Sequence, residues 1–263
     1  MKKLFIPIAL AVVSMPALLA QSAIDGTWKI DPSKVDFSKK PDVQVLQGGM
    51  YECKTCVPAY KIKADGTDQA VTGHPYYDTI AITVVNDHEI QDVRKKGGKI
   101  VSTATITVSS DGNTQTVKFS DSSATNGGPP VTGKGTAIRT AKGPAGSHAV
   151  SGSWVSKSID GISDNAIVWT YKVSGNEVTM TNPTGQSYTA KLDGTDAPMK
   201  GDPGTTSVSV KMIGKSTIEE TDKRDGKVIG TWKMTVATDG KIAKGTAVDT
   251  LANRTTLFDV VRQ

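Results

Sequence analysis

The stretch Thr79–Val84 reads Thr-Ile-Ala-Ile-Thr-Val, and 128 positions later Ser207–Met212 reads Ser-Val-Ser-Val-Lys-Met. In both stretches every second residue is apolar. Successive side chains of a β-strand point to opposite faces, so this alternation predicts strands with one buried face. The residues expected on that face are Ile80, Ile82 and Val84 in the first stretch and Val208, Val210 and Met212 in the second, or else their neighbours on the opposite face.

The two stretches belong to a longer internal repeat. When the sequence is shifted by 128 positions, 17 of the 53 residues from Tyr60 to Gly112 are identical to their counterparts, without a gap. Turn residues match as well as apolar ones, since Asp65–Asp68 and Asp193–Asp196 both read Asp-Gly-Thr-Asp. Self-similarity over this length indicates a duplicated domain.

The start of the repeated unit also recurs, because Gly26-Thr27-Trp28 is matched by Gly152-Ser153-Trp154. Between the two copies, residues 140–147 are rich in Gly, Ala and Pro, as is typical of a linker. The sequence therefore predicts one domain over residues 24–140 and a second over residues 148–263.

Each unit is predicted to be all-β. Thr, Val and Ile crowd the alternating runs, and pairs such as Gly97-Gly98 and Asp239-Gly240 separate them with hairpin turns, which make neighbouring strands antiparallel. A meander of about eight strands closes into an up-and-down barrel that has no exposed edge; a flattened sandwich or an open curved sheet is the alternative. The strands of the first unit are expected to begin near Gly26, Val43, Tyr60, Thr79, Glu89, Lys99, Thr114 and Val131.

The first twenty residues are typical of a secretory signal peptide. Lys2 and Lys3 precede the apolar run Leu4–Leu19, and Ala20 is a small residue suited to cleavage. The run is shorter than the roughly 18 residues that a membrane-spanning helix needs. We expect a signal peptide over residues 1–20 and a periplasmic or extracellular location for the mature protein.

Composition and charge exclude several classes of protein. The chain has 263 residues with 2 Cys and 5% aromatic residues, too few Cys for a disulfide scaffold and too few aromatics for the girdles of an outer-membrane barrel. Removing Lys2 and Lys3 lowers the formal charge from +5 to +3, and the remaining basic residues form no run, so a nucleic-acid partner is not expected. No later segment is apolar enough to span a membrane, so no stable membrane span is expected after signal cleavage.

The two Gly-x-Trp triplets, Gly26–Trp28 and Gly152–Trp154, resemble the signature with which lipocalins begin. The segments Tyr188–Gly201 and Ser207–Lys227 are similar to a group of uncharacterised secreted bacterial lipocalin-like proteins, in which such a block occurs once or twice per chain. The resemblance implies lipocalin-like barrels that hold a small ligand. It also implies structural barrel starts, with both tryptophans packed at a closed end, at Gly26, Trp28, Gly152 and Trp154.

Cys53-Lys54-Thr55-Cys56 is the most conspicuous motif. Thr181 and Thr184 stand at the matching positions of the second unit, so the fold itself does not require the pair. A local disulfide suits an oxidising compartment. A zinc or copper site with further ligands, a thioredoxin-like redox pair and unpaired thiols are the alternatives. Haem attachment is excluded, because the residue after Cys56 is not His.

Other candidate chemistry is sparse. His88 and His148 are expected to be exposed, and His74 has no recognisable catalytic partner in the sequence. The chain has neither a Gly-x-Ser-x-Gly elbow nor a phosphate-binding loop. Glu219 and Glu220 are adjacent and would point to opposite faces of a strand, so they do not form an acid–base pair. We expect neither an enzymatic activity nor a cofactor.

Three classes of function fit these features. An exported carrier or sensor would bind a small apolar or amphipathic ligand inside a barrel. A structural, interaction or inhibitor protein of the cell envelope would have filled barrels and would use its surface. A metal or redox module would use Cys53 and Cys56. The volume inside each barrel distinguishes the first class from the second.

Overall fold

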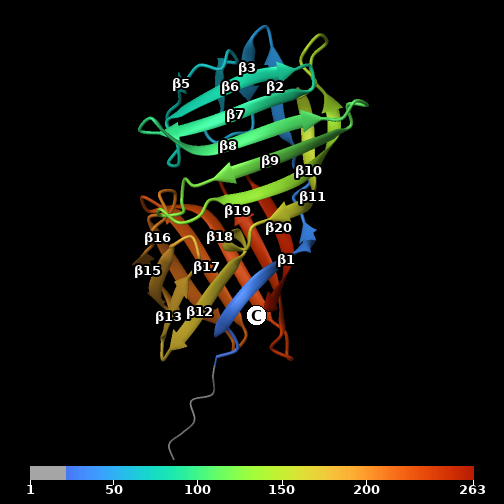
Figure 1. Ribbon diagram of the computed structural model, residues 1–263. Coiled ribbons are helices and arrows are strands. Elements are labelled where there is room, and N and C mark those ends of the chain that lie inside the picture. The colour runs from blue at the N-terminus through green and yellow to red at the C-terminus, as the bar shows by residue number, and fades with distance from the viewer. Residues whose placement is uncertain (1–21) are drawn as a thin grey trace, which may run out of the picture.

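The computed structural model describes residues 22–263, and the expected signal peptide at 1–20 lies outside them. These residues form two ten-stranded sheets, antiparallel throughout, and each sheet curls into a nearly closed barrel (Figure 1). The predicted all-β class with two barrel-like units is therefore confirmed. No helix within the described range is long and apolar enough to cross a membrane.

Lobe 1, at the top of Figure 1, is built from one continuous segment, residues 42–162. Its strand order is β4-β3-β2-β11-β10-β9-β8-β7-β6-β5. The strands are β2 (Asp42–Gln47), β3 (Met50–Cys53), β4 (Tyr60–Lys63), β5 (Gln69–Ala70), β6 (Thr79–Asn86), β7 (Glu89–Lys96), β8 (Lys99–Val108), β9 (Thr114–Asp121), β10 (Val131–Lys142) and β11 (Gly152–Ile162).

Lobe 2 is built from two segments, residues 22–36 and 163–263, and its strand order is β14-β13-β12-β1-β20-β19-β18-β17-β16-β15. A short 3-10 helix, η1 (Asp164–Ala166), precedes β12. The strands are β1 (Gly26–Asp36), β12 (Val168–Ser174), β13 (Glu177–Thr181), β14 (Ser187–Lys191), β15 (Asp193–Pro198), β16 (Ser207–Ile213), β17 (Thr217–Arg224), β18 (Lys227–Val236), β19 (Ile242–Asp249) and β20 (Arg254–Arg262).

The two copies of the repeat exchange their first strands. β1 opens the first copy but lies between β12 and β20 in lobe 2, and β11 opens the second copy but lies between β10 and β2 in lobe 1. The sheets therefore do not follow the predicted units 24–140 and 148–263. The chain crosses between the lobes at residues 37–41 and 163–167, whereas the expected linker at 140–147 ends β10 and begins its connection to β11 inside lobe 1.

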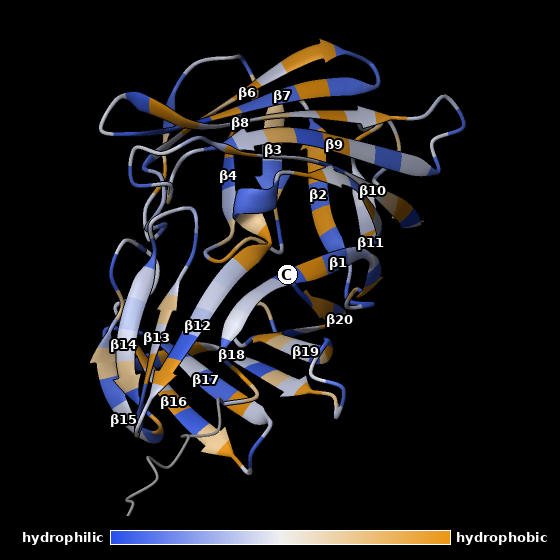
Figure 2. Cartoon of the chain, turned by 60° about the horizontal axis from the view of Figure 1, so that its bottom comes forward, coloured by the Kyte–Doolittle hydropathy of each residue, from blue (hydrophilic) through white to orange (hydrophobic). Residues whose placement is uncertain are grey.

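Alternating burial builds the two cores, and Figure 2 shows the matching alternation of apolar and polar residues along strands such as β16. Ile80, Ile82, Val208 and Val210 are fully buried, as predicted. Val84 is 43% exposed, so its predicted burial is wrong. The buried part of β6 ends at Ile82, while the pairing of β6 with β7 keeps its register up to Val84 and shifts only after it.

The predicted strand starts in the first unit agree with the structure to within one residue. Sequence reasoning missed β3 and β5, which have four and two residues. A run of two residues such as β5 cannot show a period of two.

Candidate functional site

The tryptophans of the two Gly-x-Trp triplets are buried and do not line the cavities described below. Trp28 and Trp154 are 0% and 1% exposed, and each donates its indole N–H to the backbone carbonyl four residues before it, at 2.8 and 2.9 Å. An arginine covers each ring: Arg262 lies 4.3 Å from the centre of the Trp28 ring and Arg139 lies 4.0 Å from that of Trp154. Each arginine thus forms a cation–π contact inside the protein.

The glycines of the triplets make room for these arginines. Gly26 and Gly152 have φ values of +124° and +139°, where side chains are rarely accommodated. A Cβ atom at either position would lie within 2.6 Å of a guanidinium nitrogen of Arg262 or Arg139, respectively. The recurrence of Gly in both triplets therefore has a steric cause.

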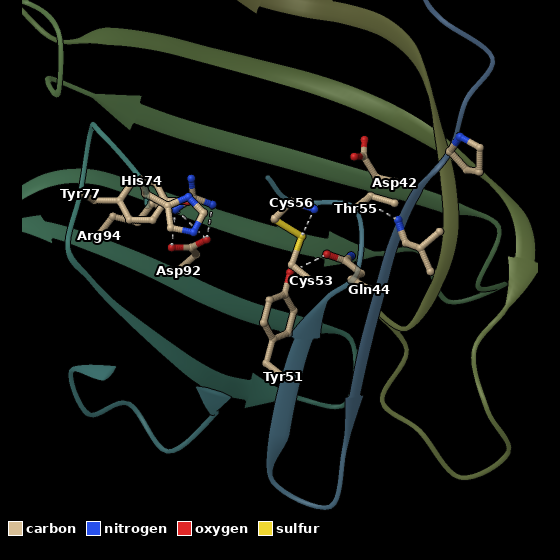
Figure 3. Close-up of a disulfide and its surroundings, with 12 residues drawn as sticks. Asp42, Gln44, Tyr51, Cys53, Thr55, Cys56, His74, Tyr77, Asp92 and Arg94 are labelled. Carbon is tan, nitrogen blue, oxygen red and sulfur yellow. Dashed lines mark hydrogen bonds and ion pairs between the residues drawn. A yellow bond between two sulfur atoms is a disulfide. The ribbon is translucent and has the colours of Figure 1, made fainter. Parts of the chain in front are cut away.

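Cys53 and Cys56 form a disulfide at the end of β3, with a Cα–Cα distance of 5.5 Å (Figure 3). Of the four alternatives drawn from the sequence, this is the one the structure supports. The described residues contain no free cysteine, and residues 22–263 hold no group of three or more His, Cys, Asp or Glu side chains suited to a metal ion. At the matching positions of lobe 2, Thr184 lies beside a cavity instead.

A cluster near the disulfide occupies part of the lobe 1 interior and satisfies its own charges (Figure 3). Arg94 donates to Asp92 at 2.8 Å, and its guanidinium lies 4.8 Å from the centre of the Tyr77 ring. His74 stacks on Tyr77 with ring centres 4.7 Å apart, and the Tyr77 hydroxyl is 3.0 Å from its Nδ1. Burial, with a contribution from the Arg94 charge, lowers the pKa of His74, which keeps the imidazole neutral at neutral pH.

The other two histidines are only half-buried and contact backbone carbonyls, so the expectation that they are exposed is wrong. His88 Nδ1 is 3.2 Å from the Val108 oxygen, and His148 Nε2 is 2.6 Å from the Asn86 oxygen. Both histidines therefore help to fix loops of lobe 1.

A cavity of about 330 Å³ opens into the barrel of lobe 2. We call it the lobe 2 cavity. Strands β1, β12, β13, β17 and β18 contribute to its wall, together with η1 and the loops after β13 and β15. Its wall includes Trp169, Tyr171, Met180, Met199, Asp202, Glu220, Asp222 and Trp232.

Two carboxyl groups lie next to each other in this wall. Glu220 and Asp222 are two residues apart on β17 and therefore share a face. Glu220 is 7% exposed and accepts a hydrogen bond from the Tyr188 hydroxyl at 2.5 Å. Burial, then the neighbouring charge of Asp222, raises the pKa of Glu220 well above its usual value, and burial also raises the pKa of Asp222.

Two tryptophans stand beside the carboxyl groups. Trp169 and Trp232 meet edge to face, with ring centres 5.1 Å apart and planes at 89°. Glu220 lies directly across the β17–β18 pair from Trp232. The indole nitrogens of both tryptophans are buried. That of Trp232 interacts with the Tyr171 hydroxyl, whereas that of Trp169 has no hydrogen-bond acceptor among residues 22–263. Buried donors are normally paired, so the Trp169 indole N–H is an unsatisfied donor beside the cavity.

A second cavity, of about 440 Å³, lies where the lobes meet and is here called the junction cavity. Lobe 1 contributes Tyr76 and Arg94, while lobe 2 contributes Asn182, Gln186 and Ala166. These last three residues also line the lobe 2 cavity, so the two cavities adjoin.

Direct contacts between the lobes surround this region. The Tyr76 hydroxyl donates to Asp202 at 2.8 Å. The Asn126 side-chain amide donates to the backbone oxygens of Thr184 and Gly201, both at 2.9 Å. These contacts hold the loops around both cavities in place.

A larger hollow of about 990 Å³ runs along β7 to β11 of lobe 1. Its lining takes three consecutive residues from each of four strands: Gln91–Val93, Thr103–Thr105, Lys118–Ser120 and Thr132–Lys134. Neighbouring residues of a strand point to opposite faces, so these side chains do not converge on one point. The lobe 2 cavity, where polar groups do converge, is the better candidate site.

Sequence reasoning set Glu219 and Glu220 aside because they point to opposite faces, and the structure agrees, with Glu220 buried and Glu219 partly exposed. The pair formed by Glu220 and Asp222 was not predicted from the sequence. It could have been, because two acids separated by one residue on a predicted strand lie on the same face.

The comparisons with known protein families and with curated proteins found no match. The functional argument therefore depends on the chain's own geometry.

Proposed function

We propose that this chain is an exported binding protein that holds a small amphipathic ligand in the lobe 2 cavity. The observation that carries the proposal is a wall that combines two tryptophans, two methionines and a carboxyl pair in which Glu220 is buried and Asp222 partly buried. Ligand sites are typically apolar pockets of about 300–1,000 Å³ with a few converging polar groups. At about 330 Å³, the lobe 2 cavity suits a compact ligand.

Export is part of the proposal, and two features support it. The sequence predicts a signal peptide over residues 1–20. Cys53 and Cys56 form a disulfide, and disulfides persist in the periplasm and outside the cell. Secretion is tested by expressing the full chain in a bacterial host and sequencing the N-terminus of the protein recovered from periplasm and medium. A full-length cytoplasmic product would contradict the proposal.

The lipocalin-like resemblance belongs to the same proposal. It is supported by the Gly-x-Trp strands and by the nearly closed antiparallel sheets. Fold alone does not determine function, so the ligand proposal depends on the cavity rather than on this resemblance.

Ligand binding is tested with the mature chain, residues 21–263, and N-phenyl-naphthylamine, a dye that is uncharged at neutral pH and fluoresces in apolar surroundings. We expect saturable binding accompanied by quenching of tryptophan emission, because two of the four tryptophans line the cavity. Ala166→Trp should weaken binding at least tenfold, since exposed Ala166 borders both cavities.

The matched control is Ala145→Trp. Ala145 is equally exposed but lies in the connection from β10 to β11, outside both cavity walls. Dye binding that is absent at high micromolar concentration, or equal in the two variants, would contradict binding at this site.

The side chains that fill part of the lobe 1 interior favour a structural role for this lobe. The Asp92–Arg94 pair, His74 and Tyr77 occupy interior space and bond to one another. Such a lobe would support the loops around the lobe 2 cavity through Tyr76 and Asn126. Phenylalanine in place of Tyr76 should lower the affinity for the dye without changing the secondary structure seen by circular dichroism.

A further inference from the structure

The internal repeat allows the two lobes to be compared position by position. A shift of 128 places Asp92 on Glu220 and Arg94 on Asp222. In lobe 1 the arginine neutralises the acid at 2.8 Å, but in lobe 2 a second acid stands where the arginine would be. Asp202 adds a third carboxyl group to the lobe 2 cavity. Among the described residues that line this cavity, none is Lys, Arg or His.

Buried carboxyl groups without a counter-charge are unfavourable when ionised. Lobe 1 removes this cost with Arg94, which belongs to the chain itself. In lobe 2 the carboxyl pair of Glu220 and Asp222 must either keep a proton or be neutralised by a cation that is not part of the chain. Burial and the proximity of Asp222 raise the pKa of Glu220, which favours the protonated carboxyl group.

The tryptophans show the same asymmetry. Of the four tryptophans, Trp28 and Trp154 each have an arginine over the ring. Trp169 and Trp232 have no such cation in the part of the chain that the structure describes. Tryptophan is the ring that binds a cation best, and a cation beside carboxyl groups gains from both contacts. The two rings without an arginine lie in the wall that lacks a positive side chain, and Phe258 stacks on one face of Trp232.

We infer that the lobe 2 cavity binds an organic cation, an amine whose ammonium group contacts Glu220 and Asp222 while its apolar body packs against Trp169 and Trp232. This inference rests on the proposed function and specifies its ligand class. An inorganic cation fits less well, because within residues 22–263 no group of three or more acidic, His or Cys side chains is arranged to hold a metal.

The inference is tested with three ligands of similar shape and different charge: phenethylamine, phenethyl alcohol and hydrocinnamate. Each is titrated calorimetrically into the mature chain at neutral pH and is also used to displace N-phenyl-naphthylamine. We expect phenethylamine to bind at least tenfold more tightly than the alcohol, a difference of about 1.4 kcal/mol, and hydrocinnamate not to bind.

Two isosteric variants test the assigned carboxyl groups. Glu220→Gln and Asp222→Asn should each lower the affinity for phenethylamine about tenfold or more, and should lower the affinities for the dye and the alcohol by a clearly smaller factor. Glu219→Gln is the matched control, because Glu219 is the neighbouring acid on the opposite face of β17. It should bind phenethylamine as the unmodified chain does.

Several outcomes would overturn the inference. These are equal binding of the amine and the alcohol, a preference for hydrocinnamate, unchanged amine affinity in both carboxyl variants, and displacement of the amine by calcium chloride. If Glu220→Gln does not fold, Asp222→Asn and the ligand series still decide. If the dye binds and the amine is not preferred over the alcohol, the proposed function stands and only the assignment of a cationic ligand is wrong. If neither the dye nor any of the three ligands binds, the proposed function is wrong as well.

Discussion

Single residues decide how the two lobes handle buried charge. Asp92 has a side chain that is 5% exposed and a partner within reach, whereas Glu220 is just as buried and has only Tyr188 and another acid beside it. A charge left unpaired away from water lowers the free energy of unfolding. The same pair of positions therefore affects stability differently in the two lobes.

The free energy of unfolding should depend on pH through Glu220. Its pKa is raised by burial and by Asp222, in a setting that also includes Tyr188 from β14, Tyr171 from β12 and Asp202 from the loop before β16. A carboxyl group whose pKa is higher in the folded state stabilises the fold below its unfolded value of about 4.3, and this stability is lost as the pH rises through the folded value.

Glu220→Gln should therefore raise the free energy of unfolding by roughly 1–3 kcal/mol in mildly alkaline buffer and by much less near pH 4. Urea denaturation at the two pH values measures this difference. A variant that is equally destabilised at both values would mean that Glu220 is ionised and satisfied in the folded chain.

Asp92→Asn should destabilise lobe 1. It leaves the Arg94 guanidinium, 32% exposed, without its carboxylate, at a cost of about 1–3 kcal/mol after allowance for solvent screening. Asp68→Asn is the control, because its ion pair with Lys95 is more exposed and should contribute no more than about 1 kcal/mol. Urea denaturation that gives equal losses for both variants would contradict the difference in burial.

At the scale of elements, local alternation predicted most of the strands, since each depends mainly on its own side chains. Interruptions such as the register shift after Val84 depend on the partner strand and are not visible in the sequence. The same limit applies to glycines inside strands. Gly245 on β19 lies opposite Phe258 on β20, whose ring occupies the place where a side chain would be. Nothing near Gly245 in the sequence indicates this contact.

Gly245→Ala should lower the free energy of unfolding by about 1–3 kcal/mol, because the new Cβ would lie 1.9 Å from a Phe258 ring atom. Gly161→Ala, on β11, is the control, since no atom lies within 4 Å of the new Cβ there. It should be neutral or slightly stabilising. Thermal unfolding of both variants measures the contrast, and equal melting temperatures would contradict it.

At the scale of the whole molecule, the exchange of β1 and β11 could not be predicted. The two strands start with nearly identical triplets, so either sequence satisfies the same position in a barrel. Which sheet each strand joins depends on the crossings at 37–41 and 163–167, a matter of long-range pairing. The candidate site was missed for a related reason: its wall combines β1 with strands more than 130 residues away.

Fragments distinguish the lobes of the structure from the units of the sequence. Residues 42–162 contain every strand of lobe 1 and should unfold cooperatively on their own. Residues 24–140 lack β11 and so expose the edges of β2 and β10; they should not give a sharp transition. Thermal scans by circular dichroism decide, and a cooperative 24–140 fragment would contradict the exchange.

The position of β1 also determines the order in which the two lobes can be completed during synthesis. The ribosome releases a chain from its N-terminus, so β1 emerges before every strand of lobe 1, whereas its neighbour β20 emerges after all of them. Lobe 1 has all its strands once Ile162 is free, while β1 stays unpaired on one side until β20 has been made. A chain that stops short of its last strand would thus carry one finished barrel and one permanently open one, a form that quality-control proteases recognise by its unpaired edges.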